Sequence, residues 1–541
     1  MLNWDNYGIL KEIIMWQILS EKDKKKYALL NALYRKYDPI TIQSLSEVSH
    51  LSQRSVLNYL DELKVDLFPL SGEIYSSNEG MKLLLPDSIG MDYFQRKLLR
   101  ESIGFQLLEY LFFQGEASCS ELQEHFFLSS SSLERILKKI RKSLEPYHLK
   151  VSGSPLAVRG QEFFIRRFYT RYFFEAYSQD EWPFRNLDKE NVHRLLKTHP
   201  PYCHEYSKFI KSQEILFQFA VSLTRAQKGH FHPVYPVSFF TEKKLPEIRQ
   251  ELRQSLTGFP LGALSLDTVL DELSFMKLQY TTEYYKERLE KDPGFQESTR
   301  ELFRLIEETT DLFQLPPSKY WPFLIELYKL LQLHVKGKGH TILPDYLLFR
   351  SRDFIIVTHH QLEYPFFYTY VTSYFKEILI SRGVTVSEGL LEEFYYTLLC
   401  YSEDLTSHLF RNFKSCSVLL YSHLSQNHAQ AVRDVLIANF NSMIDVEIYN
   451  ESVLTTEELE RYQYDLLVST SSVEMDTKSD VLYLHFHEKG YQISSIYKAI
   501  STVVDKKKAD QMKRIKNYMD KKETLKEHPL TEATFTTQYW K

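Results

Sequence analysis

Apolar residues in the N-terminal part of the chain, up to Gly160, recur every three or four positions, the spacing that lines one face of an α-helix. The pattern is clearest in segments 56–67 and 133–144, and each predicts an amphipathic helix with one side in a core. Their apolar positions are Val56, Tyr59, Leu60, Leu63 and Leu67 in the first segment, and Leu133, Ile136, Leu137, Ile140 and Leu144 in the second. The polar sides of these helices are therefore the first candidates for a binding surface.

The two predicted helices belong to an internal repeat. The segment TIQSLSEVSHLSQRSVLNYLDEL, which starts at Thr41, aligns at one constant offset and without a gap to SCSELQEHFFLSSSSLERILKKI, which starts at Ser118. The matched pairs are Leu45 with Leu122, Glu47 with Glu124, Leu51 with Leu128, Ser52 with Ser129, Ser55 with Ser132, Val56 with Leu133, Leu60 with Leu137, and Leu63 with Ile140. Self-similarity of this kind indicates that the chain contains one structural unit twice.

Each copy predicts a short helix, a tight turn and a longer helix. In the second copy Ser118 is expected to cap the short helix, and Glu121 at the third position after it completes a capping box. Ser129 is expected to cap the longer helix. Two helices joined in this way form the helix-turn-helix pattern, although His50 and Phe127 occupy the turn, where glycine is common.

A predicted β-hairpin follows each copy. The stretches EIYSSNEGMKLLL and LKVSGSPLAVRG alternate apolar and polar residues around turns that contain Gly, Asn or Ser. A hairpin in this place is a wing. The N-terminal part of the chain, positions 1–160, therefore predicts two winged helix-turn-helix modules in tandem.

The two copies differ in charge. Residues 129–150 carry six basic and two acidic side chains, a local net charge of +4, whereas residues 42–67 carry two basic and four acidic ones, a net charge of −2. Because cationic contacts to phosphates supply most non-specific affinity for DNA, the second copy is expected to carry the larger share of binding, and the first to position or pair. The alternative is a basic helical face that is merely solvated, which is the commoner case for an isolated helix.

Candidate DNA contacts lie at the start and along the outer side of each longer helix. Arg135 is best placed to read a guanine in the major groove, and the hydroxyls and amides at the helix start suit phosphates or base edges. The candidates are Ser129, Ser130, Ser131, Ser132, Arg135, Lys138, Lys139 and Lys142 in the second copy, and Gln53, Arg54 and Asn58 in the first.

The rest of the chain predicts two helical blocks and then a small α/β domain. From Gln161 to Tyr401 the pattern is helical and rich in aromatic residues, with a split near KDPGFQ. After Ser415 the strand candidates SVLLY, IDVEIYN, YDLLVST and VLYLHFH alternate with helix candidates, which predicts a parallel sheet. Sites in such sheets lie at the carboxyl ends of the strands, here the loop SHLSQNH. This loop contains no cysteine, and Cys416 precedes the strand, so we interpret the domain as a binding or dimerising module and not an active enzyme.

Composition limits the remaining possibilities. The net charge of −5 over 541 residues gives no field that would draw the whole molecule to a polyanion, so a nucleic-acid site has to be local. The four cysteines form no CxxC pair, which fits a reducing compartment, and no histidine pair has the HExxH spacing of a zinc site. Without a signal peptide or a spanning segment, the chain is expected in the cytoplasm, with no membrane, metal or cofactor.

Tandem helix-turn-helix units, two helical blocks and a terminal α/β domain resemble the Mga/AtxA family of virulence regulators from low-GC Gram-positive bacteria. The resemblance covers about residues 20 to 505 and is most specific in SCSELQEHFFLSSSSLERILKKIRKSL, GQEFFIRRFYTRYFFEAY and VSLTRAQKGHFHPVYP. It implies helical blocks similar to phosphotransferase-system regulation domains (PRD) and a tail similar to the sugar-permease component EIIB, which also mediates homodimerisation. It further implies histidines that a phosphocarrier protein can phosphorylate, for which His204, His334 and His340 are the candidates.

The expected protein is mainly α and multidomain. Its domains are a first winged helix-turn-helix (1–90), a second one of Mga type (91–160), two PRD-like helical bundles (161–288 and 289–410), an EIIB-like α/β domain (411–505) and a basic tail (506–541). The expected function is a sequence-specific regulator that binds double-stranded DNA, activates virulence or surface genes, and responds to carbohydrate status. The alternatives are a phosphotransferase-system component with accessory domains, and a scaffold that has lost DNA binding.

Overall fold

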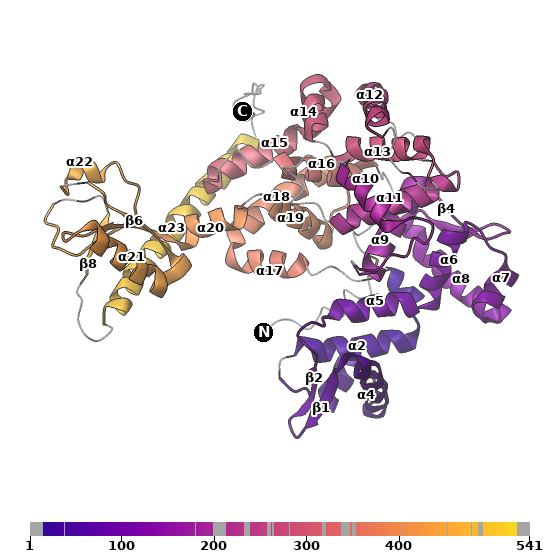
Figure 1. Cartoon of the computed structure of the whole chain (residues 1–541). Helices are drawn as coiled ribbons and strands as arrows, with labels where there is room; N and C mark the ends of the chain where they lie inside the picture. The colour runs from indigo at the N-terminus through magenta and orange to yellow at the C-terminus, as the bar shows by residue number, and fades with distance from the viewer. Residues whose placement is uncertain are drawn as a thin grey trace. The chain divides into compact units, whose positions relative to one another are not determined.

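The computed structural model describes residues 14–526, apart from 37, 179, 199–211, 232–238, 257–260, 262–263, 281, 316–320, 337–346, 349–352, 403, 452, 476, 478 and 485–490. The chain is mainly helical and divides into two compact units (Figure 1). Unit 1 comprises Met1–Gln296 and Leu333–Asp353, and unit 2 comprises Glu297–Gln332 and Phe354–Lys541.

Unit 1 begins with the first predicted module. Its elements are η1 (Ile14–Ile18), α2 (Glu21–Arg35), α3 (Ile42–Ser49), α4 (Gln53–Leu67), η2 (Phe68–Leu70), β1 (Glu73–Ser77) and β2 (Gly80–Leu84). Helix α2 packs on α3, α4 and β2, and the antiparallel hairpin β1–β2 pairs Ile74 with Leu83. These elements are the winged helix-turn-helix that the sequence predicts.

The second module repeats the same order. Its elements are α5 (Met91–Glu101), α6 (Ile103–Gln114), α7 (Cys119–His125), α8 (Ser130–Leu144), η3 (Glu145–Tyr147), β3 (Lys150–Ser152) and β4 (Ala157–Arg159). The hairpin β3–β4 pairs Val151 with Val158. An isolated backbone bridge ties each wing to the chain just ahead of the short helix of its helix-turn-helix, Ile40 with Met81 ahead of α3 and Ala117 with Leu156 ahead of α7. The bridges confirm the repeat, because Ile40 and Ala117 are separated by the same offset as the aligned segments.

The helices that follow share one hydrophobic core with both modules. They are α9 (Glu162–Ala176), α10 (Lys189–Thr198), α11 (Ser212–Gln227), α12 (Phe239–Ser255) and α13 (Leu266–Tyr280). Helix α14 (Thr282–Lys291) comes next along the chain. Leu45, Leu137 and Phe217 all belong to this core, although they come from three different parts of unit 1. Ion pairs are buried within it, since Arg166 bonds Glu162 at 3.0 Å and Glu272 at 2.7 Å.

The helical pattern breaks at Asp292, where the sequence predicts a split. The Asp292 carboxylate accepts a hydrogen bond from the Phe295 amide at 3.2 Å, and Pro293 begins the next helix, α15 (Pro293–Phe313). An aspartate cap followed by proline suits the start of a helix, because proline lacks the amide that would be unpaired there. The helices that follow α15 are α16 (Trp321–Lys336), α17 (Asp353–Glu363), α18 (Pro365–Ser381), α19 (Glu388–Tyr401) and α20 (Leu405–Lys414).

The predicted α/β domain closes unit 2. Its elements are β5 (Cys416–Tyr421), α21 (Gln426–Phe440), η6 (Asn441–Met443), β6 (Ile444–Ile448), α22 (Thr456–Leu459), β7 (Leu466–Ser469), β8 (Asp480–Tyr483) and α23 (Tyr491–Lys526). The strands pair in parallel in the order β6-β5-β7-β8, which confirms the predicted parallel sheet. Residues alternate between its faces, so Val418 packs with α21 and α23 on one side while Leu419 packs toward Tyr449 and Leu459 on the other.

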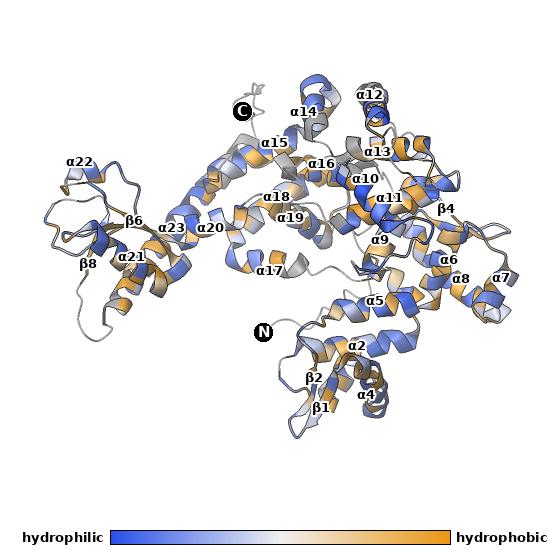
Figure 2. Cartoon of the chain, in the orientation of Figure 1, coloured by the Kyte–Doolittle hydropathy of each residue, from blue (hydrophilic) through white to orange (hydrophobic). Residues whose placement is uncertain are grey.

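Helix α23 includes residues 506–526 of the predicted basic tail. The lysine-rich stretch from residue 506 continues a helix of 36 residues, which carries both hydrophobic and hydrophilic residues (Figure 2). Ile500 is buried against the sheet, Ile515 is 8% exposed, and the ring of Tyr518 lies 6.1 Å from that of Tyr370. The lysines are the polar side of a packed helix, since the apolar residues between them follow the helical period.

Three expected domain boundaries fall inside helices. The boundary at 288/289 lies in α14, that at 410/411 in α20, and that at 505/506 in α23, which packs against α20. A continuous helix can pass from one packing environment to the next without a compositional mark, so sequence pattern alone does not locate such boundaries. Within the described ranges, no helix is long and apolar enough to span a bilayer.

Candidate nucleic-acid interface

Side-chain caps fix the ends of the helix-turn-helix in both modules. Ser118 accepts a hydrogen bond from the Glu121 amide at 3.2 Å, and the Glu121 carboxylate accepts one from the Ser118 amide at 2.6 Å, which confirms the predicted capping box. That backbone hydrogen bond holds the pKa of the Glu121 carboxyl below its usual value. Thr41 caps the matching helix α3 by accepting a hydrogen bond from the Ser44 amide, so both helices start with a side-chain cap, although only α7 has the capping box.

The turn of each module has a left-handed backbone conformation without glycine. His50 and Phe127, which the repeat aligns, both have a φ of 53°. Two residues later in each module, a serine caps the longer helix. Ser52 accepts a hydrogen bond from the Ser55 amide at the start of α4, and Ser129 accepts one from the Ser132 amide at the start of α8, both at 3.2 Å. The second turn, before each wing, repeats this conformation at Ser71 and His148. The two modules therefore have the same backbone conformation at both turns, including the strained positive φ angles at non-glycine residues.

The buried side of α8 is the one the sequence predicts. Leu133, Leu137, Ile140 and Leu144 are at most 2% exposed, and Ile136 is partly buried against the same core. The matching residues of α4, namely Val56, Leu60, Leu63 and Leu67, are at most 3% exposed. With one side fixed in the core, the opposite side of each helix faces away from it.

The outer side of α8 presents cations to solvent. Ser130, Ser131, Arg135, Lys138 and Lys142 are all exposed. Ser129 is engaged as the cap and also bonds the hydroxyls of Ser131 and Ser132, at 3.1 and 2.9 Å, and the Arg135 guanidinium donates to the Ser132 hydroxyl at 3.3 Å. Within the part of the chain that the structure describes, Lys138 and Lys142 make no ion pair. This cationic strip, Arg135, Lys138 and Lys142, is the α8 face.

Lys139 has a different role from the one the sequence suggests. Its ammonium donates a hydrogen bond to the Leu19 carbonyl at 3.3 Å, and the side chain is partly buried where η1 packs on α8. Lys139 thus ties the helix to the N-terminal segment. The neighbouring Arg141 is also engaged, through the Val151 carbonyl at 3.1 Å and Glu134 at 2.9 Å, so it secures the wing.

The outer side of α4 differs. The predicted contacts Gln53, Arg54 and Asn58 are all exposed, but the same side of the helix carries large hydrophobic residues instead of lysines. They are Leu57, Val65 and Phe68, which are 45%, 73% and 83% exposed.

The acidic residues beside that surface are largely engaged within the module. Glu62 pairs with Lys22 at 3.0 Å, and Asp66 pairs with Lys26 and, at 3.4 Å, with Lys97. Burial opposes the charged form of Asp66, but hydrogen bonds and the positive charges of Lys26 and Lys97 hold the pKa of its carboxyl below the usual value. These ion pairs fasten α4 to α2 within the first module and to α5 of the second, so they are part of the packing of the two modules.

Sequence pattern missed one exposed residue of the second module. The side chain of Phe127, in the turn ahead of α8, is 95% exposed. A bulky residue with positive φ and an exposed ring is unusual, and the signal that could have identified it is its alignment with His50 at the same turn.

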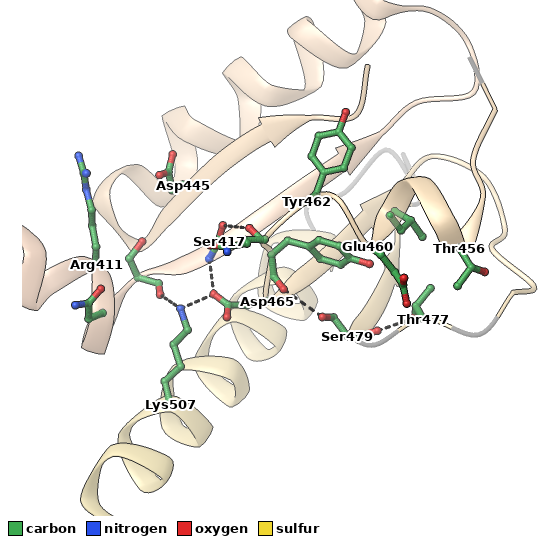
Figure 3. A pocket seen from close by; sticks show the side chains of 15 residues that line it. Arg411, Ser417, Asp445, Thr456, Glu460, Tyr462, Asp465, Thr477, Ser479 and Lys507 are labelled. Atoms are coloured by element: carbon green, nitrogen blue, oxygen red, sulfur yellow. Dashed lines mark hydrogen bonds and ion pairs between the residues drawn. The ribbon is translucent and has the colours of Figure 1, made fainter. Parts of the chain in front are cut away.

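The α/β domain has a cavity at the edge of the sheet opposite the one the sequence favours. The cavity, of about 580 Å³, lies where the strands begin, and Arg411, Asp445, Tyr462 and Lys507 are among its lining residues (Figure 3). Lys507 is paired with Asp465 and donates to the Ser415 carbonyl at 3.1 Å. The charges of Lys507 and Asp465, which both line the cavity, therefore neutralise each other.

At the carboxyl edge, the loop after β5 is closed by its own hydrogen bonds. Ser422 lies 2.8 Å from Nδ1 of His428, and Nδ1 of His423 lies 3.0 Å from the Thr470 hydroxyl. Cys416 is the first residue of β5 and is buried, and this burial, with the nearby Asp465, raises the pKa of its thiol to about 12. A neutral, enclosed thiol is a poor nucleophile.

The side chains of the three candidate phosphorylation sites lie outside the described part of the chain. His204 and His340 lie outside the described residues, and His334 lies on α16 with a side chain that is likewise outside them. Within the described ranges, no cluster of three or more His, Cys, Asp or Glu side chains has the arrangement of a metal site.

Comparison with known proteins gives the same location for the DNA-binding module. The Mga helix-turn-helix domain matches residues 89–173, which span α5 to most of α9 and include α7 and α8. A Streptococcus pneumoniae protein, named only provisionally as a trans-acting regulator, is 24% identical over 466 residues, which are 84% of this chain and 92% of that protein.

Two regulators of Bacillus anthracis match over shorter stretches. The capsule synthesis positive regulator AcpB is 22% identical over 294 residues, which are 53% of this chain and 61% of AcpB. The anthrax toxin expression trans-acting positive regulator is 24% identical over 190 residues, which are 35% of this chain and 40% of that protein. The chain thus spans less than two-thirds of either Bacillus relative. With the repeat, the two wings and the domain match, these similarities support the resemblance of the chain to the Mga/AtxA family of regulators.

Proposed function

We propose that the chain regulates transcription by binding double-stranded DNA through the α8 face. The observation that carries this proposal is the pair Lys138 and Lys142, which are exposed and unpaired in the described part of the chain, on the outer side of a helix whose start is fixed by a serine cap. An α-helix fits the major groove, and unpaired cations on its outer side meet phosphates. Arg135, nearer the start of the helix, is placed to reach base edges.

The start of α8 adds a second set of contacts. Ser130 and Ser131 are exposed at the first turn, where amide groups carry the positive end of the helix dipole. Ser129 and Ser132 hold that turn together, so they contribute to binding by positioning it. Lys139, which the sequence places among the contacts, supports the helix from behind.

The names of the relatives support the finer part of the proposal. Those from Bacillus anthracis are named as positive regulators of capsule synthesis and toxin expression, which supports activation as the direction of control and virulence or surface genes as the targets. The proposal also includes PRD-like bundles, an EIIB-like tail that pairs two chains, and input from carbohydrate status by a phosphocarrier acting on His204, His334 or His340.

A phosphotransferase-system enzyme is the competing function. It needs a phosphoacceptor in the tail domain, and the buried thiol of Cys416, with its raised pKa, does not favour that chemistry. A scaffold that has lost DNA binding is the other competitor, and it predicts no dependence of binding on the α8 face.

The test is binding of the full-length chain to a mixed-sequence duplex, measured by fluorescence anisotropy. We expect K138Q/K142Q to weaken binding by roughly tenfold for each phosphate interaction that is removed, because a hydrogen bond to a charged group contributes about 1.5 to 3 kcal/mol. Both side chains are exposed, so the fold should be unaffected, and thermal unfolding of the variant provides the control. Unchanged affinity would remove the proposal.

A further inference from the structure

The hydrophobic residues on the outer side of α4 have no cover in the described structure of unit 1. Leu57, Val65 and Phe68 lie on one side of the helix with large exposed fractions. Exposed apolar surface costs roughly 25 cal/mol per Å², and a contiguous patch of it on a folded domain usually marks an interface.

These residues form part of a heptad pattern. Arg54, Leu57, Asp61, Lys64 and Phe68 are spaced alternately by three and four positions, which is the spacing of a helix-pairing seam. Val65 flanks the seam. We call these six residues, Val65 included, the α4 seam. Phe68 continues the helical conformation of α4, with φ −53° and ψ −46°, so its side chain follows the same side.

We propose that the α4 seam pairs with the same seam of a second copy, as two antiparallel helices related by a two-fold axis at Asp61. In this arrangement Leu57 lies opposite Val65 of the other copy, and Phe68 lies opposite Arg54 of the other copy. Apolar residues therefore meet apolar residues, and a guanidinium meets an aromatic face. The contact is made twice, as a two-fold interface requires.

The charges at the axis also match. Asp61 and Lys64 bond each other at 2.9 Å within one helix, with side chains 73% and 46% exposed. Two such pairs that meet at the axis place four charges of alternating sign together, so the aspartates do not simply repel. The α4 seam is thus complementary to itself.

DNA fits the same seam poorly. Asp61 lies at its centre and projects a carboxylate where a groove would present phosphates, and the local net charge of 42–67 is −2. Lys138 of α8 occupies the position that the repeat aligns with Asp61. The duplicated helix has therefore kept its fold while the outer sides of its two copies differ, one cationic and the other apolar.

Pairing through α4 has a structural consequence for unit 1. Both modules share one core, so joining two copies at α4 would carry two α8 helices as one assembly. Dimers of helix-turn-helix proteins bind two half-sites in this way. Pairing through α4 is independent of the pairing of tail domains, and both contacts fit one dimer if they share its two-fold axis.

A disulfide trap tests the pairing directly. In the full-length C119S variant, which removes an exposed native thiol, D61C should cross-link to itself under mild oxidation, because residue 61 lies on the axis. K138C, at the matched position of α8, is the control and should remain monomeric on a non-reducing gel, as should the C119S parent. Both positions are exposed, so neither variant is expected to disturb the fold.

A second variant separates the seam from chance collision. Adding V65Q/F68Q to D61C should slow cross-linking by roughly tenfold or more, because central apolar side chains carry most of the affinity of an interface. Absence of a D61C cross-link, equal cross-linking of K138C, or indifference to V65Q/F68Q would each overturn the proposal. The D61C cross-link would be absent if unit 2 covered the α4 seam, or if two chains paired only through their tail domains. No DNA is present, so a failure here leaves the DNA-binding proposal intact.

Discussion

Helices α4 and α8 have the same place in two copies of one fold, yet they present opposite surfaces. Their caps, left-handed turns and buried leucines agree at the constant offset of the repeat. Their outer sides differ at four aligned positions. Leu57, Asp61 and Val65 of α4 correspond to Glu134, Lys138 and Lys142 of α8, and Phe68, directly after α4, corresponds to Glu145, directly after α8. The core is constrained by packing, whereas the outer side is constrained only by what it binds.

This difference shows how a duplicated module can divide two tasks. A cationic outer side suits a phosphate backbone, and an apolar one suits another protein. The distinction could not come from fold alone, since both copies are winged helix-turn-helix modules. The task of each module depends on the side chains that remain exposed, apart from those that pack in the core, cap the helices or form ion pairs.

The largest expected effect comes from moving the α4 surface onto α8. K138D/K142V places the residues of the first module at the matched positions of the second. We expect the affinity for mixed-sequence duplex to fall by roughly a hundredfold or more, because two cations that meet phosphates are removed and a repulsive carboxylate is added. Fluorescence anisotropy titration at fixed salt measures this affinity. Binding close to that of the wild type would contradict the claim that the outer side of α8, and not that of α4, binds DNA.

Matched core truncations should affect the two modules alike. L60A and L137A each remove a leucine that is 1% exposed in the wild type. We expect each to lower the free energy of unfolding by about 2 to 5 kcal/mol, the usual cost of such a cavity. Chemical denaturation measures both, and a large difference between them would show that the modules do not share an equivalent core.

Single-residue changes at the reading positions should separate the modules. R135A is expected to cost about 1 to 3 kcal/mol on a sequence that the full-length chain selects from a random library. R54A, on the first module, should change that affinity by less than about 0.5 kcal/mol. If R54A costs as much as R135A, both modules read DNA.

The caps should give the smallest effects. S118A and T41A each remove a serine or threonine cap, and each is expected to lower the free energy of unfolding by about 1 kcal/mol. In the second module, Glu121 also makes the contribution of the cap depend on pH. Because its pKa is lowered in the folded chain, its contribution is present above the pKa of the unfolded chain and is lost as pH falls through the lower folded value. Chemical denaturation of the wild type and of E121Q across pH 3 to 6 checks this, since the difference between their free energies of unfolding should shrink as the pH falls.

Local features of this fold could be predicted from sequence and non-local ones could not. The caps at Ser118 and Ser129, the buried side of α8 and the alternation of strands and helices that indicates a parallel sheet all depend on neighbouring residues or on a short repeating pattern. The role of Lys139 depends on the Leu19 carbonyl, 120 positions away along the chain, and no spacing rule connects them. The packing of the lysine-rich part of α23 was missed for the same reason.

The candidate site divides in the same way. Arg135, Lys138 and Lys142 could be identified because charge on the polar side of a predicted helix is visible in the sequence. The apolar residues of the α4 seam were overlooked, since a leucine or phenylalanine in a helix is ordinarily assigned to the core. Only their exposed fractions distinguish them.

The most direct test is the salt dependence of binding to a single-site duplex of about 15 base pairs, which holds one module and removes any effect of pairing between chains. The slope of log K against log salt concentration is measured for the full-length wild type, for K138Q/K142Q, and for R54Q/K64Q, which removes the same number of positive charges from α4. Each neutralised phosphate contributes about 0.9 to the magnitude of the slope. We expect the slope of the α8 variant to be shallower than that of the wild type by about 2, and the α4 variant to keep the wild-type slope. An unchanged slope for K138Q/K142Q, or an equally shallow slope for R54Q/K64Q, would contradict the assignment of DNA binding to the α8 face.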